Sequence, residues 1–198
     1  ATFSVITGLI GIALLSYWGT WLATCLAILT ILFYSFYYTL WLKPRTPYNI
    51  VIGGAAGAAA PLIAWAAVNG TIAWPAVVLF LLIFFWTPPH FWALAICCKE
   101  DYAKVGYPML PNVIGDDKTR VQILLYSFSL IPLSLLLLLD EKIGLLYGSS
   151  SFLLGGLFIY LAVMLLRKKT TKASWMLFGY SIVYLILLLM ILIVDVLV

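Results

Sequence analysis

The sequence is dominated by long apolar stretches, each close to the length needed to cross a lipid bilayer. A membrane-spanning helix needs about 20 predominantly apolar residues, because a helix rises only about 1.5 Å per residue. Seven stretches meet or approach this length, at residues 3–18, 21–42, 50–68, 74–97, 121–139, 144–166 and 174–197. No long polar segment separates them. We therefore expect one all-α integral membrane domain over residues 1–198, with about seven transmembrane helices.

The composition supports this assignment and excludes other classes of protein. Of the 198 residues, 65% are hydrophobic and 9% are charged, whereas a soluble domain is about half apolar and a quarter charged. No basic patch is interleaved with aromatic residues, so no nucleic acid partner is expected. Cys25, Cys97 and Cys98 form no C-x-x-C pair, which favours free thiols over disulfides or a zinc site.

The charged residues lie mainly between the apolar stretches and on one side. The loops after the second, fourth and sixth stretches contain ten of the eleven basic residues: Lys43, Arg45, Lys99, Lys104, Lys118, Arg120, Arg167, Lys168, Lys169 and Lys172. Positively charged loops normally stay in the cytoplasm. We expect these three loops to share the cytoplasmic side of the membrane.

Two polar segments on that side contain residue types suited to phosphate chemistry. Residues 98–120 combine carboxylates with lysines, and residues 37–54 contain Lys43 and Arg45. Carboxylates bind Mg²⁺ together with substrate phosphates, and Lys or Arg neutralise the remaining anionic oxygens. The pattern is consistent with a magnesium-bound phosphate site. The alternative is a solvated loop whose charges only set the topology.

The stretch "WTPPHFW", residues 86–92, places two prolines and the chain's single histidine inside an apolar segment. Pro88 and Pro89 remove two backbone donors, which membranes tolerate where a helix lines a cavity or is buried in protein. If the helix continues past Cys98, His90 and Asp101 share one face about 16 Å apart. The stretch is then a cavity wall. Alternatively, His90 is neutral and hydrogen-bonded to a neighbouring helix, and the prolines only bend the chain.

The segment "GGAAGAAAP", residues 53–61, consists almost entirely of small residues. Small residues let membrane helices approach one another closely. We expect this segment to serve packing and to lie in the core of the bundle.

Residues 38–61 and 86–113, which include the WTPPHFW and GYPMLP runs, resemble the protoheme IX farnesyltransferase (heme O synthase) family of the UbiA superfamily of intramembrane prenyltransferases. The resemblance implies a nine-helix bundle around a central cavity. It implies transfer of the farnesyl group of farnesyl diphosphate to a vinyl group of heme B, with addition of water, to give heme O for terminal oxidases. It also implies Mg²⁺ as cofactor and a location in the bacterial plasma (inner) membrane, or alternatively the mitochondrial inner membrane.

The resemblance also suggests roles for individual residues. Asp101 matches the family's second acidic motif and is expected to act in catalysis as a magnesium ligand. The residues expected to bind diphosphate are Lys43, Arg45 and Lys104. Those expected along the prenyl or heme path are Tyr38, Asn49 and Tyr102. His90 is the expected catalytic residue on the heme side, as an axial ligand, a propionate partner or a base for the attacking water.

The sequence departs from the family pattern in three ways. The family's first acidic motif, Asn-Asp-x-x-Asp, is absent, and its place would lie upstream of residue 1. We therefore expect a fragment that lacks the two N-terminal helices and is inactive alone. Pro44 stands where the family commonly has a basic residue, which weakens the case for a second diphosphate-binding cation. Ala60-Pro61 replaces a frequent Pro-Pro pair, which we interpret as a packing change.

Other functions remain as alternatives. A quinone-pathway polyprenyltransferase is expected to lack the WTPPHFW motif. A transporter usually binds its substrate at the midplane, whereas the charged residues here lie at the ends of the apolar stretches. Protein partners within heme A synthase or terminal oxidase assembly are a further possibility under the heme O synthase interpretation.

Overall fold

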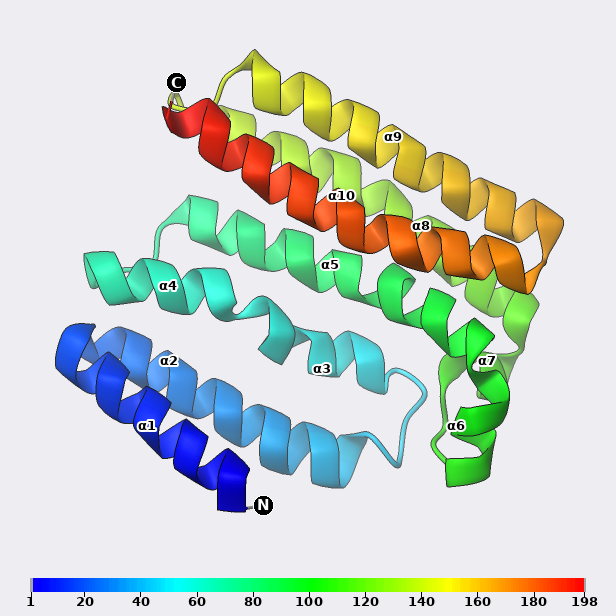
Figure 1. The fold of residues 1–198 in the computed structure, drawn as a ribbon, viewed down its shortest axis with the longest axis horizontal. Coiled ribbons are helices and arrows are strands. Elements are labelled where there is room, and N and C mark those ends of the chain that lie inside the picture. Colours follow the sequence, from blue (N-terminus) through cyan, green and yellow to red (C-terminus); the bar gives the residue numbers. More distant parts are fainter. Residues whose placement is uncertain (1, 198) are drawn as a thin grey trace.

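The computed structural model describes residues 2–197, and within that range it contains helices and no β-strand. The helices and their bounds are α1 (Thr2–Trp18), α2 (Trp21–Leu32), the π-helix η1 (Phe33–Leu42), α3 (Asn49–Ala58), α4 (Ala60–Asn69), α5 (Trp74–Cys97), α6 (Lys99–Val105), α7 (Leu110–Ile114), α8 (Asp116–Leu136), the 3-10 turn η2 (Leu137–Leu139), α9 (Leu145–Lys168) and α10 (Thr171–Leu197). Figure 1 shows the long helices side by side, with α6 and α7 at one end of the bundle.

Six of the helical spans in this range are long and apolar enough to cross a membrane, namely 21–42, 49–69, 74–97, 116–139, 145–168 and 171–197. Helix α1 is apolar but shorter, at 17 residues. The expected all-α multi-pass fold is confirmed. Helix α5 occupies the centre of the bundle and packs against α3, α4, α8 and α10.

The span predicted at residues 50–68 is not one helix. It is broken at Ala59 into α3 and α4, a break visible in Figure 1. Pro61 explains it, because proline has no N–H to give to the carbonyl of Gly57 and its ring crowds that carbonyl. Pro61 instead occupies the first turn of α4, where proline is tolerated.

The span predicted at residues 74–97 is confirmed as α5, and the condition for placing His90 and Asp101 on one helix face, a helix that continues past Cys98, is not met. Helix α5 is continuous through Pro88 and Pro89 but ends at Cys97, and the separate helix α6 begins at Lys99. The side-chain amide of Asn112 donates to the Lys99 carbonyl at 3.2 Å, which holds the chain away from the α5 axis. His90 and Asp101 therefore do not lie along one helix face.

The second span widens into a π-helix as it approaches the polar loop. The Lys43 amide donates to the Tyr38 carbonyl, five residues back, at 2.8 Å, and the Thr39 hydroxyl donates to the Tyr34 carbonyl at 2.7 Å. The rings of Tyr34 and Tyr38 stack with centroids 5.1 Å apart. π-helical turns are rare and often mark functional sites.

The three basic loops meet at the end of the bundle that carries α6 and α7, here called the basic end (Figure 1). Lys169, after α9, pairs with Asp117 at the start of α8 at 3.0 Å. Lys43, after η1, lies 4.9 Å from the ring centroid of Tyr107 in the loop between α6 and α7. The alternation of charged and uncharged loops predicted this shared side.

Candidate active site: a cavity at the basic end

A cavity of about 380 Å³ lies between η1, α3, α5 and the α6–α7 segment. This volume is in the range of small-molecule sites, which span roughly 300–1,000 Å³. The lining changes in character from the basic end inward.

The mouth of the cavity carries one cation and two phenols. Lys43, Tyr38 and Tyr102 all line it, so the structure brings together three of the residues predicted from sequence. Burial, with a smaller contribution from Cys98, raises the pKa of the Tyr102 hydroxyl. That hydroxyl therefore stays protonated at neutral pH and can donate a hydrogen bond to an anion.

The interior of the cavity is apolar and aromatic. Helix α5 contributes Ile83, Trp86, Thr87 and Phe91, and the Thr87 hydroxyl is satisfied within its own helix by the Ile83 carbonyl at 2.8 Å. Ile83 lies fourteen residues before the end of α5, or about 21 Å along the helix. A ligand with an anionic head and a long apolar tail suits this arrangement.

The glycines of α3 form the opposite wall and also serve packing. A Cβ at Gly53 would overlap the Tyr38 ring, and one at Gly54 would lie 3.0 Å from Thr87 Cγ2. The predicted packing role is confirmed at these two positions. Gly57 also lines the cavity, but a Cβ there would meet no atom within 4 Å.

His90 is part of α5 but does not line the cavity, and its ring packs toward α10. The side chain is 8% exposed and lies between the rings of Trp86 and Phe178, with centroids 4.4 Å and 4.7 Å away. Its Nδ1 is 2.6 Å from Ser181 Oγ on α10. Ser181 Oγ also lies 2.6 Å from the Phe178 carbonyl, and both contacts are hydrogen bonds when the hydroxyl donates to that carbonyl and accepts from a protonated Nδ1.

This geometry matches the hydrogen-bonded alternative for His90, since Ser181 lies on a neighbouring helix. The other ring nitrogen, Nε2, has no hydrogen-bond partner within the described part of the chain. Trp86 and Phe91, which contact the His90 ring, both line the cavity.

The remaining predicted residues lie outside the cavity lining. Asp101 and Lys104 pair with each other at 2.9 Å on the exposed face of α6, and that hydrogen bond raises the pKa of Lys104. Arg45 donates to the Trp41 carbonyl at 2.8 Å. The fully buried Asn49 donates to the Thr46 carbonyl at 2.7 Å, and its Oδ1 has no partner among the described residues.

Comparison with known proteins identifies the family. The model of the UbiA prenyltransferase family matches residues 1–192. The chain belongs to the UbiA family. It is 48% identical to a protein named protoheme IX farnesyltransferase from Parvibaculum lavamentivorans over 98% of this chain and 63% of the relative. A protein of the same name from Roseiflexus castenholzii is 47% identical over 96% of this chain and 36% of the relative.

A solved structure has the same fold as this UbiA chain. It is described as "Structural and mechanistic insights into the biosynthesis of Digeranylgeranylglyceryl phosphate synthase in membranes", with a TM-score of 0.81 and 21% identity. The match covers 100% of this chain and 69% of that one. By contrast, the chain spans 36% and 63% of the length of the two named relatives.

The described part of this UbiA chain does not hold a complete metal site. No group of three or more His, Cys, Asp or Glu side chains converges within residues 2–197. Asp101 can supply one carboxylate. Its ion pair with Lys104 is exposed to solvent, so the carboxylate can exchange Lys104 for a metal ion. Mg²⁺ at diphosphates is often bound through one or two carboxylates and the phosphate oxygens, so Asp101 fits part of such a site.

Several cavity residues were not predicted from sequence. Trp86 and Phe91 belong to the same motif as His90, and their aromatic character beside a buried polar group was the available signal. Tyr34 precedes Tyr38 by four residues, which places the two on one helix face. Met109 gave no signal, because its position depends on how α6 and α7 fold back over the cavity.

Proposed function

We propose that this chain forms part of a protoheme IX farnesyltransferase. The reaction transfers the farnesyl group of farnesyl diphosphate to a vinyl group of heme B, with addition of water, and gives heme O for terminal oxidases. One observation carries the proposal. A cavity with a cationic mouth and an apolar interior lies in a chain that is 46–50% identical to relatives bearing that name.

The donor fits the cavity with its diphosphate at the mouth. Lys43 lines the mouth and neutralises anionic oxygens. Arg45, two residues after Lys43, and Lys104, two residues after Tyr102, are the further proposed cations. The hydroxyls of Tyr38 and Tyr102 donate to the same oxygens. These groups stabilise the negative charge that develops on diphosphate as the allylic carbon–oxygen bond breaks.

The farnesyl chain then lies along the apolar interior. Trp86 and Phe91 present aromatic groups there, and aromatic faces attract cations in sites shielded from water. They stabilise the positive charge that develops on the farnesyl group. Exclusion of water by the apolar walls protects this cation until a heme vinyl carbon attacks it.

Mg²⁺ is the proposed metal, and Asp101 would give it a carboxylate while the diphosphate supplies other oxygens. When bound, the metal neutralises charge on the diphosphate. UbiA prenyltransferases generally use a divalent metal for this purpose. Asn49 remains a proposed neighbour of the prenyl or heme path.

His90 is proposed to act on the heme side through Nε2. The hydrogen bond to Ser181 fixes the ring and keeps the proton on Nδ1. Nε2 is then free to ligate iron, to meet a propionate group or to accept a proton from the attacking water. We further propose the bacterial plasma membrane as the location, with the basic end in the cytoplasm, since the compared relatives come from bacteria.

The test is a transfer assay with product identification by mass. The chain, extended to the length of its relatives with sequence from the Parvibaculum lavamentivorans protein, is incubated in membranes with heme B, farnesyl diphosphate and Mg²⁺. We expect a farnesylated, hydrated heme that is lost in Asp101→Asn and retained in Glu100→Gln, which removes the neighbouring exposed carboxylate. Prenylation of an offered aromatic acid instead of heme assigns the protein to the quinone branch. The 198-residue chain alone is expected to be inactive, and heme O formation by it would contradict that expectation.

A further inference from the structure

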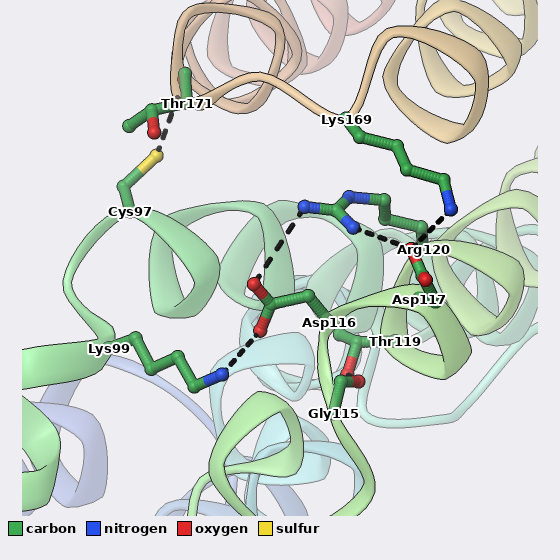
Figure 2. A network of polar contacts seen from close by, with 9 residues as sticks. All are labelled: Cys97, Lys99, Gly115, Asp116, Asp117, Thr119, Arg120, Lys169 and Thr171. Atoms are coloured by element: carbon green, nitrogen blue, oxygen red, sulfur yellow. Dashed lines mark hydrogen bonds and ion pairs between the residues drawn. The ribbon is translucent and has the colours of Figure 1, made fainter.

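Five charged side chains form a continuous ionic network at the basic end (Figure 2). Lys99 Nζ lies 2.8 Å from Asp116 Oδ1, and Asp116 Oδ2 lies 3.8 Å from Arg120 Nη2. Arg120 Nη1 lies 2.8 Å from Asp117 Oδ1, which also meets Lys169 Nζ at 3.0 Å. The network connects the start of α6, the first turn of α8 and the loop after α9.

Arg120 is the buried centre of this network. Its side chain is 8% exposed, and a cation at that depth must be compensated by nearby carboxylates. It lies in the N-terminal part of α8, where the helix dipole favours anions and disfavours cations. The carboxylates of Asp116 and Asp117, one turn earlier in the same helix, compensate the Arg120 charge through i,i+4 and i,i+3 pairs.

The other end of the network holds the segment that covers the cavity. Residues 99–112, here called the cap segment, comprise α6, the following loop and the start of α7. Asn112 donates to the Lys99 carbonyl at 3.2 Å, so the two ends of the cap segment are tied together. Between them lie Tyr102 and Met109, which line the cavity.

We propose that Asp116, held in place by Arg120, is a positioning residue that anchors the cap segment over the cavity mouth. It acts through Lys99, since the described cavity lining does not include Asp116. This inference rests on the proposed function, because it makes the affinity for the prenyl diphosphate depend on the ion pair between Asp116 and Lys99. The consequence is that substrate binding depends on an ion pair outside the cavity lining.

The kinetic test compares Asp116→Asn with Glu100→Gln in the same extended chain that is used for the transfer assay. Both remove one carboxylate from the basic end, but Glu100 has no ion pair among residues 2–197. We expect the KM for farnesyl diphosphate to rise roughly fivefold in Asp116→Asn, as for loss of a partly exposed ion pair. The turnover number changes less, and Asp116→Glu retains the parent KM. A KM unchanged in Asp116→Asn overturns the proposal.

A distance measurement tests the anchor without any activity. Spin labels are placed at Val105, exposed on α6, and at Lys168, exposed at the end of α9, after the native cysteines are replaced by alanine. We expect one narrow distance distribution in the parent and in Glu100→Gln, and a broad one in Asp116→Asn. An unchanged distribution in Asp116→Asn overturns the anchor.

Failure of the proposed function and failure of the Asp116 anchor give different results. If no prenyl transfer to any acceptor is found in the parent, the proposed function fails, and the distance measurement still decides the anchor. If Asp116→Asn does not fold, Lys99→Gln removes the same ion pair from the other side. It is expected to broaden the distribution equally, and a narrow distribution there overturns the anchor.

Discussion

Replacing Gly53 by alanine tests whether the wall of the cavity is packed as the structure shows. A Cβ at this position would overlap Tyr38 at its Cδ2 and Cε2 atoms and lie 3.0 Å from its Cζ. The overlap involves ring atoms held in the Tyr34–Tyr38 stack, so the ring has to move. We expect Gly53→Ala to displace Tyr38 and to destabilise the protein.

The magnitude follows from two opposing contributions. Forcing extra carbon atoms into a packed site costs about 1–3 kcal/mol, while alanine gains about 1 kcal/mol over glycine in a helix. Gly57→Ala, one turn further along α3, gains the same helix propensity but meets no atom within 4 Å. The difference between the two variants isolates the overlap, at about 1–3 kcal/mol.

The assay is thermal unfolding of both variants in the same detergent. For a chain of this size, 1 kcal/mol corresponds to about 2–4 °C in Tm, so Gly53→Ala should unfold several degrees below Gly57→Ala. Tyr38→Leu, which removes the ring, should restore most of the loss when combined with Gly53→Ala. Equal Tm values for Gly53→Ala and Gly57→Ala would refute the contact between Gly53 and Tyr38.

Three further predictions concern the mouth of the cavity and the histidine. Lys43→Gln should raise the KM for farnesyl diphosphate roughly tenfold, while Lys43→Arg retains the parent KM. If Lys43→Gln and the parent have equal KM values in steady-state assays, Lys43 has no role in diphosphate binding. Ser181→Ala leaves His90 Nδ1–H without its acceptor and should cost about 1–2 kcal/mol of stability. The control is Ser149→Ala, which removes an exposed hydroxyl bonded within its own helix and should leave Tm nearly unchanged. Equal Tm values for the two variants would contradict the hydrogen bond between His90 and Ser181. Burial raises the pKa of Tyr102 in the folded protein. Its contribution to the free energy of unfolding is therefore complete at neutral pH and is lost as the pH rises above about 10, where the phenol of the unfolded chain ionises first. Tyr102→Phe should reduce the fall in Tm between pH 9 and 11, and an unaltered fall would contradict its burial.

Some parts of the site could be read from sequence and others could not. Lys43, Tyr38 and Tyr102 are polar or aromatic residues at the ends of apolar spans, and the cavity brings them together. Asp101 comes from the same acidic loop, yet it faces solvent with Lys104 because α5 ends at Cys97. The spacing places His90 and Asp101 on one face only if the helix continues past Cys98, and the contacts of Lys99 with Asn112 and Asp116 accompany a separate helix instead.

The sequence by itself determined the membrane class, the approximate helix spans, the side shared by the basic loops and the resemblance to UbiA prenyltransferases. These properties depend on hydropathy, charge and short motifs, which are local in the chain. Only the tertiary structure decided which side chains meet. Ser181, 91 residues after His90, fixes the histidine ring, and Lys169 in the loop after α9 pairs with Asp117 at the start of α8. Contacts between distant segments depend on the packing of whole helices, and no local pattern in the sequence records them.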